Sequence, residues 1–299
     1  MTLLDKGIGV KLPADVAALY PFQSQVHRIG EVDMHYLDEG SGKPLLAVHG
    51  HPTWSFYFRQ LVQAFRPRRR VVVPDHIGCG LSSKPQQYRY SLARHVANLE
   101  DLVLQLDLRD IDLVVHDWGG PIGLSVAARH PHRFHRICIT NTAAFRCPEL
   151  PRLLTLARTP WLGELLIRGF NAFVQTFLLT ATAHPHRLRG ARRRGYTFPY
   201  NSWNNRIATA RFVQDIPMSS NHPSWPDLVQ LESNLPRLSE KPMLLLWGER
   251  DWCFTPRMRD RFLDIFPHAR SIGLKSAHHM LFEDEPEACL SALEEFLGE

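Results

Sequence analysis

The sequence predicts an α/β fold: a mostly parallel β-sheet flanked by helices, with a helical cap inserted between two strands. The first observation is an apolar, β-branched run at residues 111–115 that leads into a turn and then a helix at residues 121–130. The second is that short apolar strands alternate with helical patterns on both sides of this unit. The third is that the alternation stops at residues 143–235. We therefore expect a core domain of residues 1–142 and 236–299 and a cap domain of residues 143–235.

The turn of the central strand–turn–helix unit carries Asp117 at its tip, within the motif HDWGG. Two glycines after the turn let the helix backbone pack closely against it. A carboxylate is already ionised at neutral pH, so it attacks an electrophilic carbon directly and forms an ester or anhydride. The alternative is that Asp117 only caps the following helix, which would not require the neighbouring Trp118, Gly119 and Gly120. The pattern favours a nucleophile.

The N-terminal part of the predicted core begins with strands at residues 32–36 and 45–48, joined by a turn at residues 39–43. The second strand leads into HGHPTW, which ends at Trp54. Its two histidines could suggest a metal site, but the sequence offers no third ligand nearby, and the proline stiffens the loop for another purpose.

The next predicted strand, residues 71–73, leads into a glycine-rich loop at residues 74–82. Its Gly-x-Gly pattern is too short and wrongly placed for a dinucleotide-binding motif. We expect Asp75 to hold this loop in place. A helix is predicted at residues 91–106, with Ser91 as its N-cap.

The predicted cap follows a strand at residues 137–140 that ends at Asn141. Its expected helices are residues 151–156, 161–179 and 204–215. The candidates for lining an apolar substrate pocket are Trp161, Phe170, Phe173, Phe177 and Leu178. At helical spacing these side chains could equally pack within the cap.

Two further catalytic candidates come from the C-terminal part. The expected strands there are residues 242–247 and 271–273. After the first of them, Asp251 stands where an acid would orient a histidine, with Glu249 as the competing residue. After the second, the sequence SAHHM favours His279 over His278 as the base. The chain order is then nucleophile, acid, base, and in a hydrolase His279 would activate water while Asp251 fixes its tautomer.

Composition excludes several classes of protein. The chain has 299 residues, of which 44% are hydrophobic, and no apolar run or leader typical of a membrane or secreted protein. Five scattered cysteines suit a reducing cytoplasm and argue against a disulfide framework or a zinc site. The net charge of +5 is concentrated at residues 66–70 and 184–194, without the interleaved aromatic residues of a nucleic-acid platform. We expect these basic runs to be solvated, or to dock an acidic protein partner.

With these motifs in hand, the sequence resembles the haloalkane dehalogenase and epoxide hydrolase branch of the α/β-hydrolases along almost all of its length. Within that branch it is most similar to the third dehalogenase subfamily and, most closely, to the olefin β-lactone decarboxylases of bacterial long-chain olefin synthesis. The motifs that carry the resemblance are HGHPTWSFYFR (49–59), PDHIGCGLSSKP (74–85), VVHDWGG (114–120), NTAAF (141–145), RGFNAF (168–173) and NSWNNRIATARFVQDIP (201–217). The cap segments discriminate best, since epoxide hydrolases share the motif around Asp117.

The resemblance implies the α/β-hydrolase fold, with an eight-stranded sheet. It implies that Asp117 attacks a cis-β-lactone with two long alkyl chains, which becomes a cis-alkene and carbon dioxide. The backbone N–H groups of His51 and Trp118 would stabilise the developing carboxylate or oxyanion. No metal or organic cofactor is implied. The implied partners are the β-lactone synthetase and the reductase of the pathway, with the arginine-rich cap segment as a docking surface.

Two positions depart from the family pattern. Dehalogenases usually have asparagine where this chain has His51, and that asparagine and the tryptophan after the nucleophile hold the departing halide. An imidazole N–H could still donate there. Val115 stands where glycine is common, which we expect to tighten packing without changing the chemistry.

Three rival functions stay open at this point. A haloalkane dehalogenase would use Asp117, His279 and Asp251 for a two-step hydrolysis. An epoxide hydrolase would need two cap tyrosines, for which Tyr196 and Tyr200 are available, although the proline between them disfavours one shared helix. From a different class, the protein could be an inactive scaffold within an olefin-forming assembly.

Overall fold

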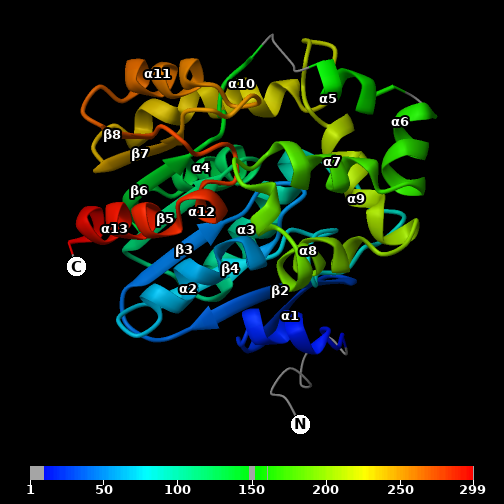
Figure 1. Ribbon diagram of the computed structural model, residues 1–299. Coiled ribbons are helices and arrows are strands. Elements are labelled where there is room, and N and C mark those ends of the chain that lie inside the picture. The colour runs from blue at the N-terminus through cyan, green and yellow to red at the C-terminus, as the bar shows by residue number, and fades with distance from the viewer. Residues whose placement is uncertain (1–9, 148–151, 160, 299) are drawn as a thin grey trace.

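A computed structural model describes residues 10–147, 152–159 and 161–298 of the protein (Figure 1). Its centre is an eight-stranded sheet with the strand order β1-β2-β4-β3-β5-β6-β7-β8. The strands are β1 Ser24–Ile29, β2 Val32–Glu39, β3 Pro44–Val48, β4 Arg70–Pro74, β5 Ile111–His116, β6 Phe134–Thr140, β7 Met243–Gly248 and β8 Arg270–Leu274. Strand β2 is antiparallel to both of its neighbours, and all other pairs are parallel. The predicted α/β fold and mostly parallel sheet are confirmed.

Helices cover both faces of the sheet. The helices of one layer are α3 Leu92–Gln105, α4 Gly119–Arg129 and α11 Pro256–Ile265, and those of the other are α1 Ala14–Leu19, α2 Arg59–Phe65, α12 Leu281–Asp284 and α13 Pro286–Leu297. In β5, Leu113 and Val115 join the apolar core under α3 and α4, while Val114 joins the core under α2 and α13. Because strand side chains alternate between faces and both faces are covered, the middle of β5 is apolar on both sides, while the buried polar residues Asp112 and His116 lie near its two ends.

Between β6 and β7, the described residues contain helices and no strand. These elements are α5 Arg152–Ala157, α6 Leu162–Glu164, the π-helical turn η4 Leu165–Gly169, α7 Ala172–Thr180, α8 Gly190–Thr197, α9 Ile207–Gln214 and α10 Trp225–Asn234, with short 3₁₀ turns between them. Figure 1 shows α5, α6, α7 and α9 gathered at one end of the sheet, while α10 packs against α4. The division into core and cap domains stays a prediction.

Several helix boundaries differ from those expected. The single helix predicted at residues 161–179 is wrong, because Asn171 adopts a left-handed conformation (φ +54°) and separates η4 from α7. The helix predicted at residues 204–215 is split into the 3₁₀ turn η7 Asn204–Arg206 and α9. Helix α5 begins at Arg152, and Pro151 lies outside the described residues. Helices α8 and α10 were not predicted; α8 carries three consecutive arginines and no apolar stripe.

Two smaller predictions about the core are confirmed. The hydroxyl of Ser91 accepts a hydrogen bond from the backbone N–H of Arg94 at the start of α3. The buried carboxylate of Asp75 accepts hydrogen bonds from the backbone N–H groups of Ser55 and Leu81, which holds the glycine-rich loop against the loop after β3.

The basic run at residues 66–70 is not a free docking face. Arg66, Arg69 and Arg70 form ion pairs with Glu39, Asp112 and Asp38 in turn, and Arg69 is buried. These arginines are therefore part of the folded core's charge balance. Among the residues that the structure describes, every helix is too short or too polar to traverse a lipid bilayer.

The segment that follows β8 is tied to the helical insertion by two buried carboxylates. Glu283 receives two N–H groups of the Arg59 guanidinium from α2 and the hydroxyl of Tyr196 from α8. Asp284 accepts hydrogen bonds from the Thr182 hydroxyl and from the backbone N–H of Ala183 at 3.0 Å. Because each carboxylate is buried, these bonds join the insertion and the core in a low-dielectric environment.

We predict that Glu283→Ala lowers the free energy of unfolding by about 3 kcal/mol, because it leaves the buried Arg59 guanidinium without its counter-charge. Urea denaturation followed by circular dichroism measures the change. The matched control is Glu294→Ala, which breaks an exposed ion pair with Arg68 and should cost less than about 1 kcal/mol. Equal effects of the two substitutions would contradict the assigned role of Glu283.

Candidate active site

Asp117 lies directly after β5 in a strained turn. Its φ is +51°, a left-handed conformation that costs a non-glycine residue about 1–3 kcal/mol. The surrounding backbone is close enough to require glycine at two positions. A Cβ at Gly50 would lie 2.2 Å from the Cβ of Asp117, and one at Gly119 would lie 2.0 Å from the carbonyl oxygen of Val48. The turn therefore projects the Asp117 side chain beyond the carboxyl end of the sheet.

The Asp117 carboxylate is buried, and one of its oxygens is already occupied. The backbone N–H of His51 donates to Oδ1 at 2.5 Å, and the backbone N–H of Trp118 also donates to the carboxylate. Burial raises the pKa of Asp117 to about 6, although the nearby His279 and these two N–H groups oppose the rise. At neutral pH the group is a poorly solvated carboxylate, and its second oxygen, Oδ2, faces the His279 ring.

His279 lies beside Oδ2 and is oriented from behind by Asp251. Its Nε2 is 3.7 Å from Oδ2 of Asp117, and its Nδ1 is 2.7 Å from Oδ2 of Asp251. Burial alone would lower the pKa of His279, but Asp251 and Asp117 together raise it above its usual value. The pKa of Asp251 is lowered despite its burial, because His279 and the backbone N–H groups of Cys253 and Phe254 stabilise its charged form. The structure thus brings together the three residues that the sequence singled out.

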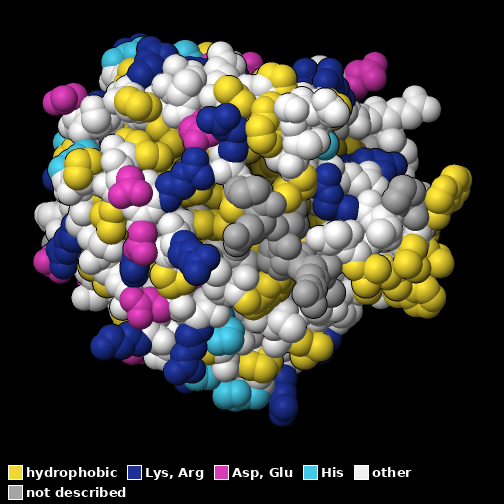
Figure 2. Space-filling model, turned by 90° about the horizontal axis from the view of Figure 1, so that it is seen from above, with side chains coloured by type: hydrophobic (Ala, Val, Ile, Leu, Met, Phe, Trp, Pro, Cys, Tyr) yellow, Lys and Arg dark blue, Asp and Glu magenta, His cyan; other side chains and the backbone are white. Residues whose placement is uncertain are grey.

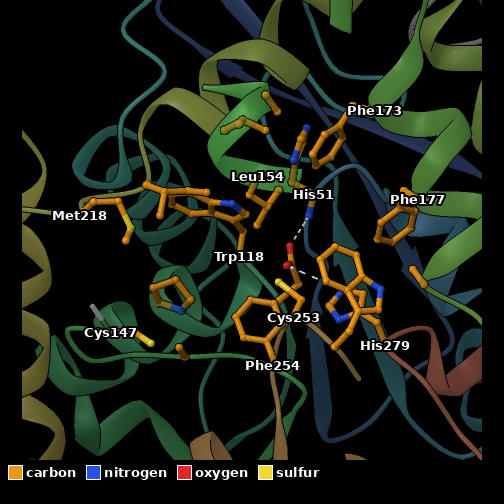
Figure 3. Close-up of a pocket in the computed structure, with 18 of the residues that line it drawn as sticks. His51, Trp118, Cys147, Leu154, Phe173, Phe177, Met218, Cys253, Phe254 and His279 are labelled. Atoms are coloured by element: carbon orange, nitrogen blue, oxygen red, sulfur yellow. Dashed lines mark hydrogen bonds and ion pairs between the residues drawn. The ribbon is translucent and has the colours of Figure 1, made fainter. Parts of the chain in front are cut away.

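The imidazole of His51 is packed as an aromatic ring. It stacks between Phe173, with ring centroids 5.1 Å apart, and Phe212, at 4.9 Å. Burial lowers its pKa to about 3, so the ring is neutral, and its Nε2 has no hydrogen-bond partner among the residues that the structure describes. Figure 3 shows this ring turned toward Phe173, while the backbone nitrogen of His51 meets the carboxylate. Phe212 also contacts Trp118 edge-on, at 5.2 Å.

A cavity of about 230 Å³ opens in front of the carboxylate. Its walls come from the helical insertion and from the loops after β6, β7 and β8, and Figure 3 shows Leu154, Met218 and Phe254 around it. Of the five predicted pocket residues, Phe173 and Phe177 line the cavity. The prediction for the other three is wrong: Trp161 is 90% exposed, Phe170 is 70% exposed, and Leu178 is buried in the core under α2 and α13.

The competing candidates lie away from the carboxylate. Glu249 forms an ion pair with Arg259 on α11. His278 does not line the cavity, and its backbone N–H binds Asp284. Tyr196 and Tyr200 are buried outside the cavity, and the hydroxyl of Tyr196 is engaged by Glu283. No tyrosine pair therefore faces the carboxylate from the described part of the insertion.

Asn141 was not predicted as a site residue, although it holds the Asp251 carboxylate in place. Its side-chain amide donates to Oδ2 of Asp251 at 2.9 Å and to the carbonyl of Gly248, and its Oδ1 accepts the N–H of Gly248 at 2.8 Å. Asn141 thus joins the ends of β6 and β7. The signal in the sequence was the position of Asn141 directly after the buried strand β6, which pairs with the strand that leads into Asp117. Phe212 was also missed, because its helix presents other apolar residues at the same spacing.

The sheet, the carboxylate at a strand–turn–helix bend and the acid and histidine that follow it in the chain define an α/β-hydrolase with a candidate aspartate nucleophile. The profile of the α/β hydrolase fold family matches residues 43–286, and the chain belongs to this family, in the group that contains β-lactone decarboxylases and haloalkane dehalogenases. The resemblance inferred from the motifs is therefore confirmed.

Three similar proteins illustrate this placement. The chain is 38% identical to the cis-3-alkyl-4-alkyloxetan-2-one decarboxylase of Shewanella oneidensis, over 94% of this chain and 90% of the relative. It is 32% identical to haloalkane dehalogenase 2 of Mycobacterium tuberculosis, over 94% of this chain and 96% of the relative. The crystal structure of a variant of haloalkane dehalogenase DatA from Agrobacterium tumefaciens superposes with a TM-score of 0.82 at 23% identity, covering 93% and 97% of the two chains, and shares the fold.

We predict that Asp117→Asn stabilises the protein at neutral pH. The pKa of Asp117 is raised from 3.8 to about 6, so the wild-type fold loses stability as pH rises through this range and the buried group ionises. The neutral variant avoids this loss, and its advantage in free energy of unfolding should grow from near zero at about pH 4 to about 1–3 kcal/mol at about pH 7.5.

Denaturant titrations at several pH values measure this difference. The matched control is Asp260→Asn, which changes a largely exposed carboxylate on α11 and should alter the free energy of unfolding by less than about 1 kcal/mol. A constant difference between wild type and Asp117→Asn across the series would contradict the burial argument.

Proposed function

We propose that the protein is a β-lactone decarboxylase that converts long-chain cis-3-alkyl-4-alkyloxetan-2-ones to cis-alkenes and carbon dioxide, with Asp117 as the nucleophile. The observation that carries the proposal is the coincidence of two findings. The chain is 38% identical over nearly its whole length to a relative named for this reaction. The Asp117 carboxylate also faces a cavity whose lining is almost entirely apolar, which suits a substrate with two alkyl chains.

The site supports attack on the ring carbon that bears the ring oxygen rather than on the lactone carbonyl. Attack on a carbonyl needs N–H donors aimed at the substrate's own oxygen. Here the N–H groups of His51 and Trp118 hold the nucleophile's own carboxylate, and we propose that Oδ2, which lies beside His279, is the oxygen that reacts. In the first step Oδ2 bonds to that ring carbon, the bond to the ring oxygen breaks, and the substrate becomes an alkyl ester of Asp117 with a free carboxylate.

The second step releases both products and restores the enzyme. The bond between the neighbouring carbon and the free carboxylate breaks, its electron pair forms the double bond, and the ester bond to Oδ2 breaks. Carbon dioxide leaves, and Asp117 recovers its electron pair, so no water or proton is consumed. Inversion at the attacked carbon followed by anti elimination converts a cis-lactone to a cis-alkene, in agreement with the proposed stereochemistry.

In this reaction His279 has an electrostatic task. Its raised pKa favours the imidazolium, which Asp251 holds in orientation through Nδ1. The other ring nitrogen, 3.7 Å from Oδ2 of Asp117, offsets the negative charge that gathers on Oδ2 as the ester bond breaks. We propose that Asn141 acts through Asp251 as a positioning residue.

The arrangement favours the decarboxylase over a dehalogenase in one respect. A halide leaving group needs donors on the substrate side of the nucleophile, and dehalogenases of the family place an asparagine amide there. In this chain the corresponding side chain, the His51 imidazole, is turned toward Phe173 and packed between two phenyl rings. Trp118 is the one halide donor of the family pattern that the chain retains.

We also propose that the protein works with the synthetase that makes the β-lactone and with the reductase of the same pathway. The candidate docking segment is the basic run at residues 184–194. Within it, Arg189 and Arg192 are exposed, whereas Arg194 pairs with Asp15 and Arg193 binds Gln175. The two exposed guanidinium groups would meet an acidic surface of a partner.

We predict that the purified protein forms alkene from a synthetic long-chain cis-dialkyl β-lactone, and that Asp117→Ala reduces the rate at least about 1,000-fold, because the reaction loses its covalent intermediate. Gas chromatography of the extract and headspace measures the alkene. The control is Glu249→Ala, which removes a nearby carboxylate outside the site and should change the rate less than about twofold.

Contrary outcomes separate the alternatives. A β-hydroxy acid in place of alkene would make the protein a lactone hydrolase. Halide release from bromoalkanes without alkene formation would make it a dehalogenase. If a reconstituted pathway formed as much olefin with Asp117→Ala as with the wild type, the protein would be a scaffold.

The proposed mechanism also predicts that Asp117 never exchanges its oxygen with water. Turnover in water enriched in the heavy oxygen isotope should leave the peptide that contains Asp117 at its natural mass, because no water attacks the ester. Mass spectrometry of the digested enzyme reads this directly. Incorporation of the heavy isotope during lactone turnover would show hydrolysis of the ester and would contradict the second step.

A further inference from the structure

The helical insertion ends in an exposed apolar surface that the proposed reaction does not use. The surface, here called the cap tip, consists of Leu162 on α6, Leu165 on η4, and the residues that flank these two elements, Trp161 and Phe170. Their exposed fractions are 48%, 49%, 90% and 70% in turn. Figure 2 shows apolar side chains gathered at the right-hand edge of the molecule, where α6 lies in Figure 1. Large apolar side chains gathered in this way mark an interaction site.

The charges beside the cap tip are mainly positive. Arg158 and Arg206 donate to backbone carbonyl groups, and within the described ranges neither guanidinium has a carboxylate within ion-pair distance. Glu164, the one acidic residue among residues 152–170, is already paired with Arg168 and Arg211. The insertion as a whole, residues 143–235, has eleven arginines against five acidic residues, so it carries the positive charge of the chain. An apolar surface bordered by uncompensated cations is complementary to an anionic lipid surface.

The cap tip is continuous with the wall of the cavity. Leu156 on α5 lines the cavity and is also 45% exposed. In η4, Leu165 faces outward, while the next two residues, Leu166 and Ile167, line the cavity. The same short helices therefore present one apolar face to the outside and another to the substrate site.

We propose that the cap tip docks the protein peripherally on an anionic lipid surface, with the aromatic side chains of Trp161 and Phe170 at the headgroup level and Arg158 and Arg206 against the phosphates. The lipid role rests in part on the proposed function, because a lactone with two long alkyl chains and its alkene product both partition into lipid. Docking in this orientation places the cavity wall formed by α5 and η4 next to the bilayer.

Vesicle co-sedimentation tests the proposal without substrate. The protein should sediment with vesicles of phosphatidylcholine containing about one quarter phosphatidylglycerol, bind pure phosphatidylcholine vesicles more weakly, and lose binding as salt is raised. The double variant Trp161→Ala, Phe170→Ala should bind the anionic vesicles at least about ten-fold more weakly. The matched control is Leu104→Ala, which removes an exposed apolar side chain (42%) from α3, far from the cap, and should bind as wild type does.

Three results would overturn the proposal. The first two are no binding of the wild type to anionic vesicles and equal binding by the double variant. The third is a dimer in sedimentation velocity that the double variant abolishes, which would assign the cap tip to a second copy of the protein. A parallel assay separates this proposal from the reaction. The double variant should decarboxylate a short-chain, water-soluble β-lactone at the wild-type rate and lose rate only with a long-chain lactone supplied in vesicles. Vesicle binding without alkene from any lactone would leave the docking site standing and reject the proposed function.

Discussion

The structure depends on keeping one carboxylate ionised where water is scarce. Asp117 faces an apolar cavity, and burial alone would favour its protonated form. Two backbone N–H groups and the His279 imidazole compensate for the missing solvent, and each requires its own support. The N–H groups require the strained turn and the glycines packed against it, and the imidazole requires Asp251, which in turn is fastened by Asn141. The ends of five parallel strands, β3, β5, β6, β7 and β8, thus converge on one charge.

The sheet and the three catalytic candidates Asp117, Asp251 and His279 could be predicted from sequence, because each follows from a local pattern. A buried parallel strand is apolar along its length, and a functional side chain directly after it has a fixed place at the carboxyl edge of the sheet. The helical insertion offered no such rule. Its helices are short, and Asn171 breaks a segment whose apolar residues do not keep to one helical face, so helical spacing could not distinguish the cavity face from the solvent face. For this reason Phe173 and Phe177 were placed correctly and Trp161 was not.

The departures from the family pattern are accommodated by neighbours on other elements of the fold. Val115 fits beneath the turn that carries Asp117, because the facing position on α4 is Gly123, where a Cβ would lie 2.7 Å from the valine side chain. His51 fits because Phe173 and Phe212 enclose its neutral ring. A single sequence shows that Val115 and His51 are unusual, but it does not show which residues accommodate them. Only the unusual residues could therefore be recognised from the sequence.

The two carboxylates after His279 limit how freely the insertion can be exchanged between related enzymes. Glu283 and Asp284 belong to α12, which closely follows the histidine, yet their partners Tyr196 and Thr182 belong to the insertion. A chimera that received a foreign insertion would remove the donors of Tyr196 and Thr182, leave Glu283 paired with Arg59 but without its second donor, and disturb the segment next to the histidine. The insertion is therefore not an independent module. Recombination that preserves this site must transfer the insertion together with the segment from His279 to Asp284, as one inherited unit.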